Sequence, residues 1–218
     1  MINILCYGDS NTFGSIPKAN KRYSINERWT GILQNILGND YRIIEEGLGG
    51  RTTVFDDPFE PGRNGIAYIE IALETHKPLD LVILSLGTND VKAHFSTTSN
   101  LIAKGIRRII FKIRNSEDPM NYKKPEILLL APPPIGNKVD IVNDFSGFNE
   151  NSVKISKELA EKYKLLAEQE KVHFFDLGSI VQASEEDQIH FNKESHKIIA
   201  EHLSKEIKNI LIHKKLII

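Results

Sequence analysis

The chain has 218 residues, and its 28 Lys and Arg residues against 29 Asp and Glu residues leave a formal net charge of −1. This balance gives no electrostatic reason to expect nucleic acid or an anionic membrane as a partner. The length suits one domain, residues 1–218, with a substantial core. No apolar run approaches the ~18 residues that a membrane-spanning helix needs.

The lone cysteine, Cys6, lies inside the first apolar run and has no partner for an internal disulfide. We therefore expect it to be a small buried side chain. Because the first predicted strand begins at Ile2, we expect no secretory signal peptide and a cytoplasmic location.

Apolar runs and helical patterns alternate along the chain. The runs predict strands at Ile2–Tyr7, Tyr41–Glu46, Leu79–Leu86, Glu126–Ala131 and Val172–Asp176. The patterns predict helices at Arg28–Leu37, Gly65–Thr75, Leu101–Ile113, Phe148–Glu170 and Ser195–Ile212. This alternation predicts an α/β protein whose parallel sheet is covered on both faces. Loops are expected at Ser15–Asn26, Val54–Asn64 and Pro132–Ser146, and the apolar residues Leu216, Ile217 and Ile218 of the tail are expected to pack.

Polar and glycine-rich segments follow the predicted strands. In chain order they are Gly8-Asp9-Ser10, Glu46 to Thr53, Gly87-Thr88-Asn89-Asp90, Pro132-Pro133-Pro134 and Asp187 to His190. Ligands of parallel sheets bind at the carboxyl ends of the strands. A serine, a glycine turn, an asparagine amide and an Asp/His pair are therefore predicted to converge on one rim.

Ser10 is the candidate nucleophile of this rim, because it lies in a tight turn between a strand and a helix. Serine needs a base to take its proton, and His190 can be that base. Asp187, three residues earlier, can reach the imidazole and orient it. The alternatives are a helix cap for Ser10 and a surface carboxylate beside an ordinary histidine for the pair. His196 lies in a helical stretch, where a structural or exposed role is expected.

A tetrahedral intermediate also needs hydrogen-bond donors at its oxyanion. The N–H groups of Ser10 and Gly50 and the side-chain amide of Asn89 are the candidates. The alternatives are a simple tight turn at Gly50 and a helix cap at Asn89. Asp9 and Asp90 are expected to fix loops as hydrogen-bond acceptors. For Arg51, a structural ion pair with the nearby acids is expected in preference to binding of a substrate carboxylate.

Four ordered blocks carry a resemblance that covers nearly the whole chain. Gly8-Asp9-Ser10, Gly50, Gly87-Thr88-Asn89-Asp90 and Asp187-x-x-His190 resemble the blocks of the SGNH hydrolases, also called GDSL esterases. The resemblance implies a three-layer α/β/α sandwich with a five-stranded, parallel, flavodoxin-like sheet. It also implies ester hydrolysis through an acyl-enzyme, with Ser10, Asp187 and His190 catalytic, with the oxyanion held by Ser10, Gly50 and Asn89, and with no metal or organic cofactor.

Several further segments resemble the arylesterase and acyltransferase branch of that family. They are Arg28-Trp29-Thr30-Gly31, Glu45-Glu46-Gly47-Leu48, Arg51-Thr52-Thr53, Asp56-Asp57-Pro58 and Leu79-Asp80-Leu81-Val82. Asn11 departs from the branch, which often has an apolar residue there, and we assign Asn11, Thr88 and Lys92 to the substrate pocket. By analogy with the branch, a homo-oligomer is expected.

The predicted function is hydrolysis of short-chain, acetyl-like carboxylic esters of small molecules, with acyl transfer to alcohols as a second outcome. A non-catalytic small-molecule-binding module on the same sheet is the main alternative. A flavin carrier and a Mg²⁺-dependent phosphohydrolase that uses Asp9, Asp57 and Asp90 are weaker alternatives. Only the esterase hypothesis uses all the converging residues.

Overall fold

The computed structural model describes residues 1–116, 120–143 and 146–215, with the side chains of the last helix described up to Leu211. The predicted packing of Leu216, Ile217 and Ile218 therefore lies outside the described residues. Five parallel strands form one sheet in the order β2-β1-β3-β4-β5. The strands are β1 (Ile2–Gly8), β2 (Tyr41–Gly47), β3 (Leu81–Ser85), β4 (Glu126–Ala131) and β5 (His173–Asp176).

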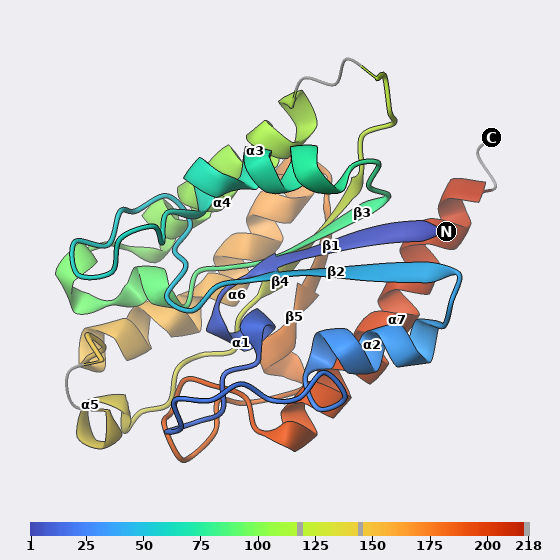
Figure 1. Ribbon diagram of the computed structural model, residues 1–218. Helices are drawn as coiled ribbons and strands as arrows, with labels where there is room; N and C mark the ends of the chain where they lie inside the picture. Colours follow the sequence, from blue (N-terminus) through green and yellow to red (C-terminus); the bar gives the residue numbers. More distant parts are fainter. Residues whose placement is uncertain (117–119, 144–145, 216–218) are drawn as a thin grey trace.

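Helices cover both faces of this sheet (Figure 1). The longer helices are α2 (Trp29–Leu37), α3 (Gly65–His76), α4 (Ser99–Asn115), α6 (Glu150–Glu170) and α7 (Lys193–Lys215). Helices α3, α4 and α6 lie on one face, and α2 and α7 lie on the other (Figure 1). The predicted three-layer α/β/α sandwich is confirmed.

Short helical segments were not among the residue ranges predicted as helices, although a helix was expected to follow the turn at Ser10. They are α1 (Ser10–Phe13), α5 (Val139–Val142) and the 3₁₀ turns η1 (Asn89–Val91), η2 (Ala93–Phe95) and η3 (Leu177–Ser179). Helix α5 lies inside the predicted loop Pro132–Ser146, which corrects that prediction. Segments of three or four residues are too short to display a helical period in the sequence.

The two cores follow from the alternation of side chains along the strands. In β1, Ile4 and Cys6 pack toward α2 and α7, whereas Leu5 and Tyr7 pack toward α3, α4 and α6. All four side chains are fully buried. Burial raises the pKa of the Cys6 thiol well above its ordinary value, so the thiol is neutral and packs as an apolar group.

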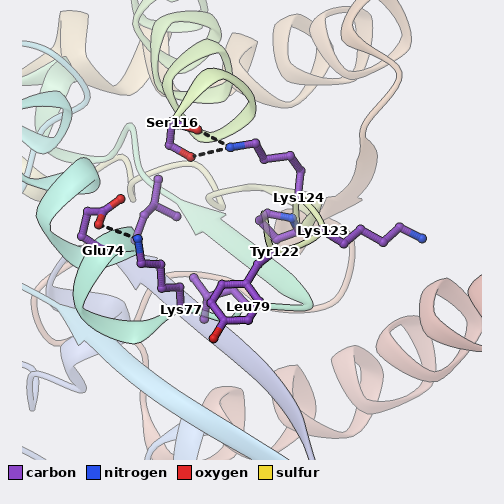
Figure 2. A pocket seen from close by; sticks show the side chains of 9 residues that line it. Glu74, Lys77, Leu79, Ser116, Tyr122, Lys123 and Lys124 are labelled. Atoms are coloured by element: carbon purple, nitrogen blue, oxygen red, sulfur yellow. Dashed lines mark hydrogen bonds and ion pairs between the residues drawn. The ribbon is translucent and has the colours of Figure 1, made fainter. Parts of the chain in front are cut away.

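A small pocket lies at the amino-terminal edge of the sheet, between the end of α3 and the segment that leads into β4 (Figure 2). Lys77, Leu79 and Lys124 line it, and its volume is about 30 Å³. This volume admits little more than water. The pocket is therefore too small to bind a substrate, and the candidate site lies at the opposite rim, where the carboxyl ends of the strands meet.

No helix within the described ranges combines the length and the apolar character needed to cross a bilayer.

Candidate active site

Ser10 begins helix α1 directly after the end of β1. The Asp9 carboxylate caps this helix by accepting a hydrogen bond from the Asn11 N–H at 2.9 Å. The turn requires glycine at position 8, because a Cβ there would lie 2.1 Å from the Thr12 hydroxyl. Ser10 is thereby held at the rim of the sheet, with 7% of its surface exposed.

His190 and Asp187 meet Ser10 in a hydrogen-bonded chain. His190 Nε2 lies 2.9 Å from Ser10 Oγ, and His190 Nδ1 lies 2.6 Å from Asp187 Oδ2. Because a carboxylate accepts at Nδ1, the network assigns the ring proton to Nδ1 and leaves the Nε2 lone pair facing the hydroxyl. The arrangement can move a proton from the serine to the imidazole.

The segment from Asp187 to His190 folds around its own carboxylate. Asp187 Oδ1 accepts the backbone N–H groups of Ile189 at 3.0 Å and His190 at 2.8 Å. Burial raises the pKa of Asp187, but the hydrogen bonds and charge of His190 and the two backbone N–H groups outweigh it and bring the pKa to about 2. Asp187 is therefore a carboxylate at neutral pH.

The three candidate oxyanion donors, Ser10, Gly50 and Asn89, line one cavity together with His190. This cavity has a volume of about 430 Å³. Gly50 adopts a φ of +74°, and a Cβ there would lie 2.9 Å from Glu60 Oε2. Asn89 donates one amide hydrogen to the Arg51 carbonyl at 3.0 Å, which leaves its second hydrogen for another acceptor. Among the described residues, neither the Ser10 nor the Gly50 N–H has a hydrogen-bond acceptor.

The loop that carries Gly50 is held in place by contacts of Arg51 and Asp90. The Arg51 guanidinium donates to the Gly8 carbonyl at 2.9 Å and lies 4.1 Å from the centre of the Tyr7 ring. The Asp90 carboxylate accepts the Thr53 N–H at 2.9 Å, and burial raises the Asp90 pKa to about 6. Arg51 also lies 4.0 Å from the Glu46 carboxylate. The structural roles predicted for Arg51, Asp9 and Asp90 are therefore confirmed.

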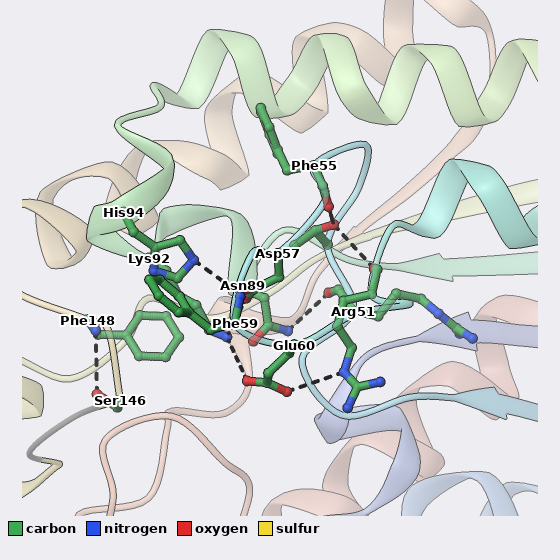
Figure 3. A network of polar contacts seen from close by, with 12 residues as sticks. Arg51, Phe55, Asp57, Phe59, Glu60, Asn89, Lys92, His94, Ser146 and Phe148 are labelled. Carbon is green, nitrogen blue, oxygen red and sulfur yellow. Dashed lines mark hydrogen bonds and ion pairs between the residues drawn. The ribbon is translucent and has the colours of Figure 1, made fainter.

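Lys92 lies on the wall of the cavity in a network of charges that sequence analysis did not predict (Figure 3). Its ammonium group lies 3.2 Å from Asp57 and 3.3 Å from Glu60, and Glu60 lies 3.3 Å from Arg63. The pair of Lys92 and Asp57 is almost completely buried. Because Asp57, Glu60 and Arg63 belong to the predicted loop Val54–Asn64, their approach to Lys92 depends on a loop conformation that carries no sequence signal.

Asn11 and Thr88 are not among the side chains that line this cavity, in contrast to the prediction. The Asn11 side chain instead bonds to the backbone on both sides of His190, at Ile189 and Phe191. The Thr88 side chain lies near the Asp9 carboxylate and favours its charged form. Residues that do line the cavity, but were not singled out, are Phe13, Ser15, Leu48, Gly49, Glu60, Arg63, Asn143, Ser146, Phe148 and Ile189.

His196 has the structural role expected for it. Its side chain is buried, and Nδ1 accepts the Trp29 N–H at 3.2 Å. Burial, with the nearby His190 and Arg28, lowers the pKa of His196 to about 4.

In the described part of the chain, no group of three or more His, Cys, Asp or Glu residues is arranged to hold a metal ion, and Asp9, Asp57 and Asp90 form no such group.

A hydroxyl, an imidazole and a carboxylate at the rim of an α/β/α sheet define the class of serine hydrolases. The model of the GDSL-like lipase/acylhydrolase family matches residues 6–198. The chain belongs to this family and is a carboxylic ester hydrolase.

Solved structures agree with this assignment. An aryl esterase from M. smegmatis is 37% identical, with a TM-score of 0.87, over 96% of this chain and 99% of that chain. A carbohydrate acetylesterase from Sinorhizobium meliloti is also 37% identical, with a TM-score of 0.90, over 96% of this chain and 100% of that chain. No match was found among curated protein sequences.

Proposed function

We propose that residues 1–218 form one domain that hydrolyses short-chain, acetyl-like esters through an acyl-enzyme on Ser10. The observation that carries this proposal is the chain from Ser10 Oγ through His190 to Asp187, with distances of 2.9 and 2.6 Å. Both distances are those of hydrogen bonds that can carry a proton. The buried carboxylate of Asp187 favours the imidazolium that forms when His190 accepts it.

In the first half of the reaction, Ser10 Oγ bonds to the ester carbonyl carbon while its proton passes to His190 Nε2. The carbonyl electron pair moves to oxygen, where the N–H groups of Ser10 and Gly50 and the Asn89 amide donate hydrogen bonds. The bond to the alcohol oxygen then breaks, and His190 returns the proton to the leaving alcohol. Ser10 remains as its ester with the acyl group.

In the second half, a water molecule or a second alcohol attacks this ester. His190 takes the proton of the attacking group, and Ser10 leaves with that proton. Water yields the acid, and an alcohol yields a new ester. The chain's own residues supply each proton transfer of this cycle.

The lining of the cavity supports a small acyl group and a polar alcohol. Phe13, Leu48, Phe148 and Ile189 are its larger apolar side chains, whereas Glu60, Arg63 and Lys92 carry charge. The names of the similar structures, an aryl esterase and a carbohydrate acetylesterase, support phenols and sugars as the alcohols.

A panel of p-nitrophenyl esters from acetate to octanoate, beside acetylated sugars, tests the proposal. We expect kcat/KM to be highest for acetate and to fall with chain length, and we expect Ser10→Ala to abolish hydrolysis. Faster hydrolysis of octanoate would contradict the short-chain specificity. Reversible ester binding without hydrolysis would favour the binding module instead.

The cytoplasmic location and the homo-oligomer stay predictions. Cell fractionation tests the first, and light scattering on the purified protein tests the second. The expected small-molecule ester substrate agrees with the family.

A further inference from the structure

The Asn11 side chain lies on the side of helix α1 that faces the segment carrying His190, and not on the wall of the cavity. Only 5% of this residue is exposed. Asn11 Nδ2 donates to the Ile189 carbonyl at 3.3 Å, and Asn11 Oδ1 accepts the Phe191 N–H at 3.1 Å. One amide thus bonds to the two neighbours of His190 and uses one donor and its acceptor.

These bonds join two parts of the chain that are far apart in sequence. In the described residues, the two Asn11 bonds and the bond between Ser10 and His190 are the only hydrogen bonds between α1 and the segment 187–191. At its own backbone, Asn11 is bonded to the Asp9 cap of α1. The Asn11 backbone is therefore fixed next to Ser10, while its side-chain amide bonds to the two residues that flank His190.

We propose that Asn11 is a positioning residue that fixes the distance between Ser10 and His190. The inference rests on the proposed function of these two residues. Proton transfer requires Nε2 and Oγ to stay within hydrogen-bond reach, and a misplacement of about 1 Å can cost roughly 10²-fold in rate. Asn11 touches neither the cavity nor the reacting atoms, so it acts through the position of His190.

The Asp187–His190 bond does not need Asn11 to form. Both residues belong to one short segment, and Asp187 also accepts the backbone N–H of His190 at 2.8 Å. Loss of Asn11 should therefore leave the imidazole oriented on Asp187 while the whole segment moves relative to Ser10. A persisting Asp187–His190 bond, together with slower reaction at Ser10, would distinguish a positioning role of Asn11 from a general role in stabilising the fold.

Asn11→Leu is the test, because leucine has a similar shape and removes both hydrogen bonds. Gln34→Met is the matched control. The Gln34 amide also clamps backbone, donating to Gly38 and Tyr41 at 3.1 and 2.9 Å and accepting the Ile43 N–H at 2.8 Å, but it contacts α2 and β2 and does not line the cavity. Both variants thus lose a comparable set of hydrogen bonds.

The measurements are kcat and KM for p-nitrophenyl acetate, the rate of fluorophosphonate labelling at Ser10, the melting temperature, and the downfield proton resonance of His190 Nδ1–H. For Asn11→Leu we expect kcat and the labelling rate to fall 10- to 100-fold, KM to change less than threefold, and the Nδ1–H resonance to persist. For Gln34→Met we expect a lower melting temperature and an unchanged kcat.

A kcat within twofold of wild type in folded Asn11→Leu would overturn the inference, and a higher KM at unchanged kcat would make Asn11 a substrate contact. If Asn11→Leu does not fold, Asn11→Asp keeps the shape and the bond from Phe191 while losing the bond to Ile189. It should then show the same fall in labelling, and normal labelling would again overturn the inference. Wild-type protein without labelling at Ser10 would instead refute the proposed function.

Discussion

In the proposed mechanism, the two hydrogens of the Asn89 side-chain amide have different partners. One donates to the Arg51 carbonyl at 3.0 Å and fixes the amide, while the other can donate to an oxyanion. Since this second bond strengthens as the carbonyl oxygen gains charge, we expect Asn89→Ala to lower kcat by roughly 10²–10³ and to leave KM nearly unchanged. The measurement is steady-state kinetics on p-nitrophenyl acetate.

The melting temperature of the same variant separates this role from a helix cap. Asn89 begins the turn η1, and no side-chain cap bond is present at its start. A cap would contribute about 1 kcal/mol to stability without affecting turnover. A destabilised Asn89→Ala protein with near-normal kcat would show that the oxyanion is held by other groups.

Asp187→Asn probes the orientation of the imidazole. The amide of asparagine can donate a hydrogen bond where the carboxylate accepts one. His190 would then adopt the other tautomer, in which Nδ1 accepts from the amide and the proton lies on Nε2, facing Ser10. We expect kcat to fall by roughly 10³–10⁴ while the protein remains folded. Because the pKa of Asp187 is about 2, its ionisation should not limit activity between pH 5 and pH 8. A fall of less than tenfold in kcat would contradict the assigned tautomer.

At the scale of elements, His196 joins α7 to the start of α2 through its bond to Trp29. The pKa of His196 is about 4 in the folded protein, compared with the ordinary histidine value of 6.5 that applies to the unfolded chain. A lowered histidine pKa stabilises the fold above the unfolded pKa, and this stability is lost as the pH falls from 6.5 toward 4. The difference corresponds to at most about 3 kcal/mol.

His196→Asn isolates this contribution, because asparagine can accept the Trp29 N–H but does not titrate. Buried Asp9 and Asp90, whose pKa values are raised to about 6, change stability in the opposite sense over this range in both proteins. Urea unfolding at pH 7 and pH 4 gives the comparison. Wild type should lose more stability on acidification than the variant, and equal losses would contradict the inferred neutral state of His196.

The Lys92–Asp57 pair ties the loop Val54–Asn64 to the turn that follows Asn89. Lys92→Met removes the ammonium partner of the Asp57 carboxylate, which keeps the Phe59 N–H and lies 3.5 Å from His94. The change should therefore cost at most about 3–5 kcal/mol of unfolding free energy. Glu60, whose side chain is 44% exposed, should contribute less than Asp57. Combining Lys92→Met with Asp57→Asn should recover part of the loss in urea unfolding. No recovery would show that the two side chains act independently.

Buried apolar runs explain why the five strands were predictable. Each observed strand lies within two residues of its predicted ends, from Ile2 in β1 to Asp176 in β5. Burial on both faces makes such strands continuous in hydrophobicity. The turn at Ser10 predicted a helix after β1 without its bounds, whereas the four-residue helix α5 was not predictable, because it is shorter than the pattern that identifies a helix.

The candidate site also contains residues that the sequence predicted and contacts that it did not. Ser10, Gly50, Asn89 and His190 follow strand ends, and parallel topology alone brings such positions to one rim. The contacts of Asn11 and of Lys92 depend on how short helices and an irregular loop turn their side chains. Residue order carries no signal for these orientations, so Asn11 was expected in the pocket and the partners of Lys92 were not foreseen.

At the scale of the whole molecule, the core and the site are separate in chemistry although β1 serves both. Cys6 is fully buried against α2 and α7, two residues before the turn that carries Ser10. Cys6→Ser would bury a hydroxyl, which should cost about 1–3 kcal/mol of stability and leave kcat unchanged. Thiol reagents should not react with the native protein. Inactivation by such a reagent without unfolding would place Cys6 closer to the chemistry.

Covalent labelling of Ser10 decides whether this residue is the nucleophile. A fluorophosphonate should modify the wild-type protein at Ser10, as located by mass spectrometry of its peptides. Ser15 lines the same cavity but, within the described residues, makes no hydrogen bond to His190, so Ser15→Ala is the matched control for Ser10→Ala. We predict that Ser15→Ala is labelled like wild type and that Ser10→Ala is not labelled. An adduct on Ser15 or Ser146, with Ser10 unmodified in folded protein, would show that Ser10 is not the nucleophile.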